Sequence, residues 1–416
     1  MVNQMKILFI YSNFNELGGV TTHMNNLKNI LEKFGHEVIK LSFQEGGDYN
    51  IKHKFPKTHI LNFSVDQKLV KKTLQVISKI KPDIIHVHHR STCMRTAKEI
   101  FKNIQKNLRI PIIATMHGFG ISGCFTAKYF KPDGTLCDGK AALFKCLSCA
   151  DTLKKKLVLL KHLIINLHFG YIPYFKQFDK VIIPSKALID FALLRGMDKN
   201  KIVYLPNFGE ITVKENYEYE NDRFDLPYNN FFLFVGRLCE EKGILELVEA
   251  YKFYSANTKS PIPLVIIGDG PLKNKLKDIT KNNRNIIILG KLSQNKLIPY
   301  YERALGIFIP SICLENHSLV LLESIYFNKI IIATNRGGNK ETLELYPKKI
   351  LLDVKTREEL KKKLYEVMKN FDIYREKLES IKFENRKFFT KLTSAKEYVK
   401  KLLKVYENAI NEYRKE

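Results

Sequence analysis

The sequence alternates short runs of aliphatic and β-branched residues with longer amphipathic stretches, and it does so twice along the chain. In the first half, the strand-like runs are KILFIYS, HEVIKLSF, PDIIHVHH, IPIIATM, FDKVIIPS and KIVYLPN. In the second half, the alternation returns with FFLFVGR, PLVIIGDG, NIIILGKLS, LGIFIPS and KIIIATN. Strands that alternate with helices are typical of parallel sheets covered by helices. The pattern therefore predicts two α/β domains in one chain.

The length of 416 residues also favours two domains, because one hydrophobic core seldom serves so long a chain. The alternation lapses near residue 209, where a polar and turn-rich stretch is typical of a linker. We therefore expect an N-terminal domain over residues 1–208 and a C-terminal domain over residues 209–393. Apolar residues at helical spacing predict a long amphipathic helix over residues 394–416.

The formal net charge of +26 favours anionic partners, such as nucleic acid, anionic lipid or phosphorylated small molecules. A lysine-rich genomic composition explains the charge equally well, so charge selects no function by itself. The apolar run near the N-terminus is too short for a signal peptide or a membrane span. We therefore expect a cytoplasmic protein.

Several candidate residues directly follow the predicted strands. Ligands of open parallel sheets bind at the carboxyl ends of the strands, so we expect the site in the cleft between the two domains. Gly18 and Gly19 lie between the first strand and a helix, where backbone N–H groups can approach an anion. A plain tight turn is the alternative for this pair. His117 follows the strand IPIIATM.

Arg237 and Lys242 bracket the turn in VGRLCEEKG, just after the strand FFLFV. A planar guanidinium and a mobile ammonium together suit a diphosphate group. The alternative is a surface cluster of salt bridges with Glu240 and Glu241. The chain has no GxxxxGK[ST] motif, which argues against a P-loop NTPase.

Two glutamates lie eight residues apart in IPSICLENHSLVLLE, just after the strand LGIFIPS. Ser318 can cap the following helix, which places Glu315 in the loop and Glu323 within the helix. The free N–H groups of Leu319 and Val320 would then point toward an anion. Glu323 can accept hydrogen bonds from two vicinal hydroxyls of a ribose, and Glu315 can reach a second ring. A carboxylate in so apolar a helix is costly unless it has a partner.

The chain carries, in this order, a glycine turn after the first strand, HG after a later strand, VGRLCEEKG, GDGP, the paired glutamates and GGNKE. This set resembles the family-four retaining glycosyltransferases of the GT-B fold, also called glycosyl transferases group 1. The resemblance covers almost the whole chain. It implies two Rossmann-like domains that face each other across a cleft.

The resemblance also implies an activity, the transfer of a sugar from a nucleotide-diphosphate sugar to a hydroxyl of a glycan or lipid-linked glycan. Diphosphate binding would fall to Arg237 and Lys242, ribose binding to Glu323, and donor-sugar binding to Glu315. The implied catalytic residues are His117, Arg237, Lys242 and Glu315. The implied donor-binding residues are Gly18, Gly19, Gly290, Ser318, Leu319, Val320 and Glu323.

No DxD motif occurs in the chain, so we expect no catalytic divalent metal. The leaving diphosphate would then be stabilised by Arg237, Lys242 and helix ends. By resemblance we expect retention through a front-face route, in which the departing phosphate oxygen takes the proton of the acceptor. A GT-B sugar-nucleotide epimerase or phosphorylase is the alternative within enzymes.

Four cysteines lie close together after the HG turn, in an insertion of about residues 120–150 that some members of the family also carry. They are Cys124, Cys137, Cys146 and Cys149. Disulfides are rare in cytosolic proteins, so we expect a structural Zn²⁺ site of four thiolates. An iron–sulfur cluster and free thiols are the alternatives.

The segment of about residues 153–176 combines lysines with apolar and aromatic residues. It could rest on an anionic membrane, on the inner face of the cell membrane, and admit a lipid-linked acceptor. The alternative is a core helix with a lysine-covered outer face. A nucleic-acid-binding protein is suggested by charge alone, and no RNP, zinc-finger or helix-turn-helix signature supports it, so we expect no nucleic-acid partner.

Overall fold

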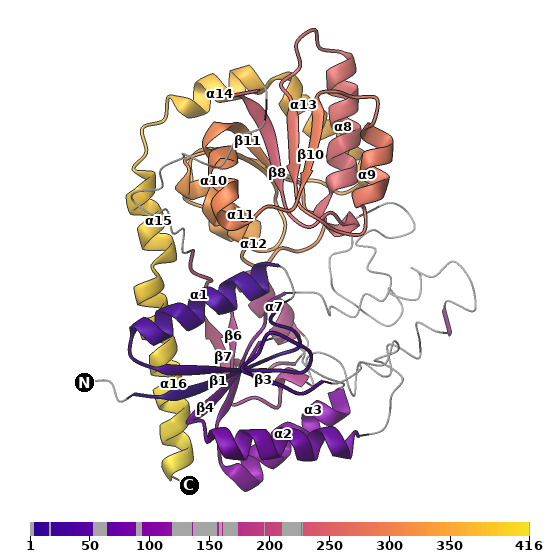
Figure 1. Cartoon of the computed structure of the whole chain (residues 1–416). Coiled ribbons are helices and arrows are strands. Elements are labelled where there is room, and N and C mark those ends of the chain that lie inside the picture. Colours follow the sequence, from indigo (N-terminus) through magenta and orange to yellow (C-terminus); the bar gives the residue numbers. More distant parts are fainter. Residues whose placement is uncertain are drawn as a thin grey trace. The chain divides into compact units, whose positions relative to one another are not determined.

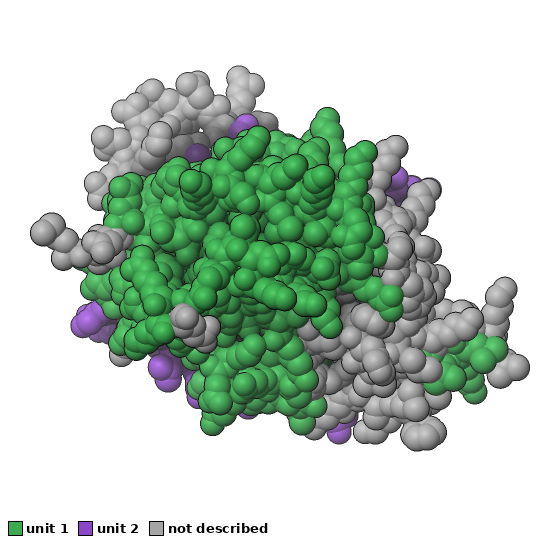
Figure 2. All heavy atoms as spheres, turned by 90° about the horizontal axis from the view of Figure 1, so that it is seen from below, with its two compact units in different colours: residues 1–125, 140–208, 394–416 green, residues 126–139, 209–393 purple. Residues whose placement is uncertain are grey.

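The computed structural model describes residues 4–15, 18–52, 65–88, 94–118, 135, 156–157, 160, 174–194, 196–209, 226 and 228–415. The chain divides into two compact units, coloured separately in Figure 2. Unit 1 comprises residues 1–125, 140–208 and 394–416, and unit 2 comprises residues 126–139 and 209–393. Each unit is built on one parallel sheet with flanking helices (Figure 1), which confirms the predicted α/β fold with two Rossmann-like domains.

The sheet of unit 1 has seven strands in the order β3-β2-β1-β4-β5-β6-β7, all of them parallel. Their bounds are β1 (Lys6–Tyr11), β2 (Glu37–Ser42), β3 (Tyr49–Asn50), β4 (Ile84–His88), β5 (Ile112–Thr115), β6 (Lys180–Ile183) and β7 (Ile202–Tyr204). Strands β4 and β5 are buried along their whole length, as expected of strands covered on both faces. The strand order reverses between β1 and β4, and this is the switch point where such sheets bind ligands.

The helices of unit 1 follow the same alternation. Their bounds are α1 (Gly19–Lys33), α2 (Gln67–Ile80), α3 (Met94–Asn103), the π-helix η1 (Ile104–Leu108), α7 (Lys186–Leu194), the 3-10 helix η2 (Lys199–Lys201) and α16 (Ala395–Lys415). Helix α16 packs against α1, and the two helices cross in the view of Figure 1. Its residues Tyr398, Leu402 and Tyr406 are buried in the core around β1. The last helix of the chain is therefore part of unit 1.

The sheet of unit 2 has six parallel strands in the order β10-β9-β8-β11-β12-β13. Their bounds are β8 (Phe231–Val235), β9 (Leu264–Ile267), β10 (Ile286–Gly290), β11 (Ala304–Ile309), β12 (Ile330–Thr334) and β13 (Lys349–Leu352). The order reverses between β8 and β11, so the loops that follow these two strands meet at the switch point.

The helices of unit 2 cover both faces of this sheet. Their bounds are the 3-10 helix η3 (Glu240–Lys242), α8 (Ile244–Ala256), α9 (Lys273–Thr280), α10 (Gln294–Arg303), α11 (Leu319–Tyr326), α12 (Gly338–Leu343), α13 (Arg357–Lys369), α14 (Phe371–Glu379) and α15 (Asn385–Thr393). Two separate clusters of buried side chains pack against the sheet, one around Phe232 and Phe308 and the other around Leu233 and Ile307. Within the described residues, no helix is long and apolar enough to cross a bilayer.

Candidate functional site

The switch point of unit 2 holds an ion pair between two residues that sequence reasoning singled out. The Nζ of Lys242 lies 2.6 Å from the Oε1 of Glu315. Lys242 ends the short helix η3 after β8, and Glu315 lies in the loop between β11 and α11. Ser311 donates a second hydrogen bond to the same Glu315 oxygen, at 2.5 Å. The structure therefore brings a predicted phosphate-binding cation and a predicted sugar-binding carboxylate together.

The two charges of this pair stabilise each other in a site that is largely withdrawn from water. Burial raises the pKa of the Glu315 carboxyl, but the Lys242 ammonium and the hydrogen bonds outweigh it, and the pKa ends below its ordinary value. Burial likewise acts to lower the pKa of Lys242, and Glu315 reverses that effect and raises it. Both side chains are therefore charged near neutral pH.

Arg237 lies on the same loop as Lys242, but its guanidinium faces a different partner. Its Nη1 is 3.8 Å from the Oε1 of Glu241, and 68% of its side chain is exposed. For Arg237 the structure thus shows the alternative arrangement, a local salt bridge with Glu241. Lys242 pairs with neither Glu240 nor Glu241. The backbone oxygen of Glu241 accepts hydrogen bonds from the N–H groups of residues 312 and 313. This short helix therefore supports the Glu315 loop directly.

Glycines allow these loops to approach closely. Gly243 has a φ of +68°, and a Cβ placed on it would lie 2.0 Å from the carbonyl oxygen of Pro310. A Cβ placed on Gly338 would lie 1.5 Å from the carbonyl oxygen of Asn316. The N–H of Gly338 also donates to the backbone oxygen of Glu315 at 2.6 Å. The Glu315 loop is thus held from one side by the β8 loop and from the other by the GGNKE turn.

Glu323 lies in helix α11 and has a partner that the sequence did not reveal. The hydroxyl of Tyr301, on helix α10, donates a hydrogen bond to the Oε2 of Glu323 at 2.5 Å. Burial raises the pKa of Glu323 to about 7, and the Tyr301 hydrogen bond opposes this rise only in part. The carboxylate inside an apolar helix is therefore hydrogen-bonded, as its burial requires.

Helix α11 begins at Leu319, as predicted, and Ser318 holds the N-cap position with an extended backbone. The predicted side-chain cap is wrong, because the Ser318 hydroxyl does not reach an N–H group of the first turn. The N–H groups of Leu319 and Val320 belong to the set that no helix bond satisfies. Gly290 closes β10, two strands away from β8 in the sheet order, and has a φ of +78°.

The carboxyl ends of the strands in unit 1 carry a cluster of four histidines. His86 and His88 project from β4, His23 lies on helix α1, and His117 follows β5. The rings of His86 and His88 have centroids 4.0 Å apart, and those of His88 and His117 are stacked at 5.4 Å. The Nδ1 of His88 lies 3.1 Å from the Nε2 of His117. The sequence pointed to His117 alone, although the alternation in HVH already placed the other two on one face of a strand.

His86 is fixed from both sides. Its Nε2 lies 2.7 Å from the hydroxyl of Thr115 on β5, and its Nδ1 lies 2.8 Å from the hydroxyl of Tyr406 on α16. Burial holds the pKa of His86 and that of His88 well below the ordinary value, and neighbouring histidine rings lower both further. Both imidazoles are therefore neutral at pH 7.

Gly18 and Gly19 mark the start of helix α1, at the switch point of unit 1. Gly19 is the first helical residue and Gly18 precedes it with an extended backbone. A Cβ placed on Gly18 would meet no atom within 4 Å. Neither conformation nor packing within the described residues requires a glycine at position 18, and anion binding by this pair stays a prediction.

Two expectations fall outside the described residues. They concern the four cysteines Cys124, Cys137, Cys146 and Cys149 and most of the basic segment 153–176. Among the residues that are described, no group of three or more His, Cys, Asp or Glu side chains is arranged to hold a metal ion. The histidine cluster is therefore not arranged to hold a metal ion. The cysteine site stays a prediction.

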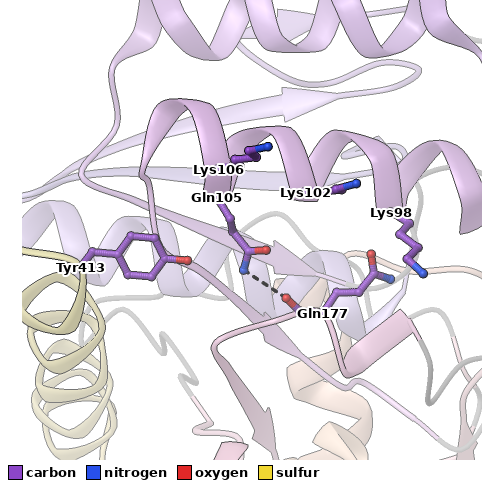
Figure 3. Close-up of a pocket in the computed structure, with 6 residues that line it drawn as sticks. All are labelled: Lys98, Lys102, Gln105, Lys106, Gln177 and Tyr413. Atoms are coloured by element: carbon purple, nitrogen blue, oxygen red, sulfur yellow. Dashed lines mark hydrogen bonds between the residues drawn. The ribbon is translucent and has the colours of Figure 1, made fainter. Parts of the chain in front are cut away.

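Unit 1 also has a hollow of about 500 Å³, shown in Figure 3. Its lining residues are Lys98, Lys102, Gln105, Lys106, Gln177 and Tyr413. Gln105 donates hydrogen bonds to the backbone oxygen of Gln177 and to Asp179, just before β6. Asp179 in turn accepts from the N–H of Ile112 at the start of β5. The hollow therefore lies at the amino ends of the strands, away from the edge that carries the histidines.

Each half of the chain matches a known protein family. Residues 17–209 match the family Glycosyltransferase Family 4, and residues 219–388 match Glycosyl transferases group 1. An uncharacterized glycosyltransferase of Methanocaldococcus jannaschii is 26% identical over 97% of this chain and 98% of its own. The alpha-monoglucosyldiacylglycerol synthase of Acholeplasma laidlawii is 25% identical over 74% of this chain and 75% of its own.

Solved structures with the same architecture include a glycosyltransferase and a sucrose-phosphate synthase by title. A glycosyltransferase from Rickettsia africae has a TM-score of 0.65 at 20% identity, covering 98% of this chain and 99% of that one. The sucrose-phosphate synthase of Thermosynechococcus elongatus has a TM-score of 0.65 at 16% identity, covering 97% and 98%. HepE of Anabaena, in complex with UDP, has a TM-score of 0.62 at 14% identity, covering 97% and 100%. These likenesses confirm the GT-B fold.

Proposed function

The chain carries a Glycosyltransferase Family 4 domain and a glycosyl transferases group 1 domain, and we propose that it transfers a sugar from a nucleotide-diphosphate sugar to a hydroxyl acceptor with retention of configuration. The observation that carries this proposal is the Lys242–Glu315 pair at the switch point of unit 2. A cation and a sugar-binding acid held 2.6 Å apart suit a ligand in which a phosphate is bonded directly to a sugar.

The donor would be bound by groups of unit 2 that follow its strands. Lys242 and Arg237 would meet the diphosphate, together with the first N–H groups of helix α11. Glu323 would accept hydrogen bonds from the ribose hydroxyls. Structures similar to this chain are complexes of HepE with UDP and with UDP-glucose, which supports a nucleoside diphosphate as the leaving group.

In the proposed reaction, the bond between the anomeric carbon and the phosphate oxygen breaks and its electron pair stays on the diphosphate. The acceptor oxygen bonds to the same face of the anomeric carbon, and its proton passes to the departing phosphate oxygen. Lys242 and Arg237 stabilise the charge that develops on the diphosphate, so we propose that no catalytic divalent metal is required. His117 would lie beside the reacting sugar, in unit 1.

We further propose a glycan or lipid-linked acceptor and a cytoplasmic enzyme at the inner face of the membrane. The name of the Acholeplasma laidlawii relative, a diacylglycerol glycoside synthase, supports a lipid-linked acceptor. The lysines of segment 153–176 would contact anionic lipid. The four-cysteine insertion would be a structural zinc site.

Thermal denaturation with UDP, GDP, ADP and their sugars tests the donor proposal. A ligand at one hundred times its Kd raises the unfolding free energy by about 2.7 kcal/mol, so the correct nucleotide stands out by its shift in Tm. Turnover of that sugar nucleotide, followed with and without EDTA, then tests metal independence. Salt-sensitive RNA binding without any response to nucleoside diphosphates would contradict the proposal.

A further inference from the structure

His88 and His117 form a hydrogen-bonded pair of stacked imidazoles at the carboxyl ends of neighbouring strands. The two nitrogens are 3.1 Å apart and the ring planes differ by 27°. His88 is completely buried, whereas His117 is half-buried. A substrate can thus contact His117 from solvent. His88 has no such access, so it can influence a substrate only through its contact with His117.

The surroundings leave His88 little freedom to rotate. Its backbone pairs with Thr115 in the parallel ladder between β4 and β5. The ring of His86, fixed by Thr115 and Tyr406, lies against one face, and the ring of Phe9 contacts His88 edge-on with centroids 4.8 Å apart. A ring held in this way presents its Nδ1 in one direction only.

The second nitrogen of His88 decides which ring donates the hydrogen bond. Within the described residues, the buried Nε2 of His88 has no hydrogen-bond partner. A buried N–H without a partner is rarer and costlier than a buried acceptor with an unused lone pair. A neutral His88 therefore keeps its proton on Nδ1 and leaves Nε2 bare, so it donates and the Nε2 of His117 accepts.

We propose that His88 is a positioning residue, which fixes the ring of His117 and holds it in the tautomer with the proton on Nδ1. This inference rests on the proposed function, in which His117 lies beside the reacting sugar. With Nε2 occupied as an acceptor, a neutral His117 is an N–H donor through Nδ1. Such a donor suits a hydroxyl or ring oxygen of a sugar. In this tautomer His117 donates a hydrogen bond through Nδ1 and does not act as a base toward the sugar.

Substitutions at position 88 can separate the hydrogen bond from the bulk of the ring. The amide nitrogen of asparagine can take the place of the histidine Nδ1, whereas that of glutamine extends to the place of Nε2. We expect His88→Asn to keep kcat within about threefold of the wild type. We expect His88→Gln and His88→Leu to lower kcat by about 10- to 100-fold, the range for a reacting group displaced by about 1 Å. The donor KM should stay within about twofold in all three, because the proposed nucleotide contacts belong to unit 2.

Long-range ¹H–¹⁵N correlation spectra of protein labelled in its 11 histidines give a direct readout of the tautomers. Spectra of variants at positions 88 and 117 assign the signals. We expect an Nδ1 proton on both rings in the wild type, and a His117 signal that moves toward the Nε2 tautomer in His88→Gln. A wild-type His88 that carries its proton on Nε2 would overturn the proposal.

His36 supplies a matched control, because it is a buried histidine of unit 1 whose Nδ1 accepts from the N–H of Met5 at 3.2 Å. We expect His36→Gln to keep the wild-type kcat even if it lowers Tm. His117→Ala separates the two levels of the argument. Full turnover in His117→Ala would remove the proposed role of His117. A large loss in His117→Ala, with equal losses in His88→Asn and His88→Gln, would leave that role intact and refute the positioning by His88.

Discussion

The ammonium of Lys242 and the carboxylate of Glu315 join the loops that follow β8 and β11, across the one place in unit 2 where the strand order reverses. The side chain of Glu315 is 10% exposed and that of Lys242 is 30% exposed. Because Glu315 is less exposed to water than Lys242, its carboxylate relies more on the ion pair to stay ionised. Under the proposed function, a sugar diphosphate would meet at this site a cation that a buried acid already orients.

Removing Lys242 alone should destabilise unit 2. The Lys242→Met variant leaves Glu315 buried without a cation, and we expect the unfolding free energy to fall by about 2–3 kcal/mol, less than for a fully buried pair because Lys242 is partly exposed. The Lys242→Met, Glu315→Gln double variant should recover much of this loss. Urea denaturation at pH 7 of both single variants and the double variant gives the coupling energy. Strictly additive effects would show that the pair is not coupled.

Arg237 should behave in the opposite way, with a large effect on turnover and a small one on stability. Its exposed ion pair with Glu241, at 3.8 Å, contributes at most about 1 kcal/mol. If Arg237 stabilises the leaving diphosphate, Arg237→Ala should lower kcat by about 10²–10³-fold. Arg237→Lys should recover only part of that loss, because an ammonium lacks the planar fork. Glu241→Gln is the matched control and should keep turnover, and wild-type kcat in Arg237→Ala would contradict the assignment.

The strand ends of the site could be predicted because an apolar run followed by glycine or charged residues is a local signal. The run LGIFIPS became β11 with Glu315 just beyond it. The partner of Glu323 could not be predicted, because Tyr301 lies 22 residues away and the bond depends on how α10 packs beside α11. The histidine cluster was missed for a related reason. His86 and His88 share a buried strand, and only the sheet order brings His117 beside them.

Gly338 tests whether the approach of the GGNKE turn to the Glu315 loop matters for function. A Cβ at this position would lie 1.5 Å from the carbonyl oxygen of Asn316, so Gly338→Ala must displace backbone. We expect a loss of about 1–3 kcal/mol in unfolding free energy and a fall in kcat of about 10²-fold. Gly35→Ala is the control, since its φ of +87° makes alanine strained but no atom lies within 4 Å. That variant should lose about 1 kcal/mol and keep its turnover.

Glu323 should make the protein less stable as the pH rises from 4.5 to 7. Its pKa is raised from 4.5 to about 7 in the folded state, so over this window the folded protein keeps a proton that the unfolded chain has lost. The effect is at most about 3.5 kcal/mol, because the pKa rises by about 2.5 units and one unit corresponds to about 1.4 kcal/mol. The lowered pKa of Glu315 acts with the opposite sign and below pH 4.5, so it does not overlap. Urea denaturation should find Glu323→Gln equal to the wild type near pH 4.5 and more stable at pH 8.

The same titration should govern nucleotide binding if Glu323 accepts hydrogen bonds from ribose hydroxyls. A protonated Glu323 has lost acceptor capacity, so the affinity for a ribonucleoside diphosphate should weaken as the pH falls through 7. The 2′-deoxy analogue of the same nucleotide should show a smaller pH dependence, because it offers one hydroxyl fewer to the carboxylate. Isothermal titration calorimetry at pH 6 and pH 8 measures both ligands. Equal pH dependence for the two would place the ribose elsewhere, even though the stability effect of Glu323 would remain.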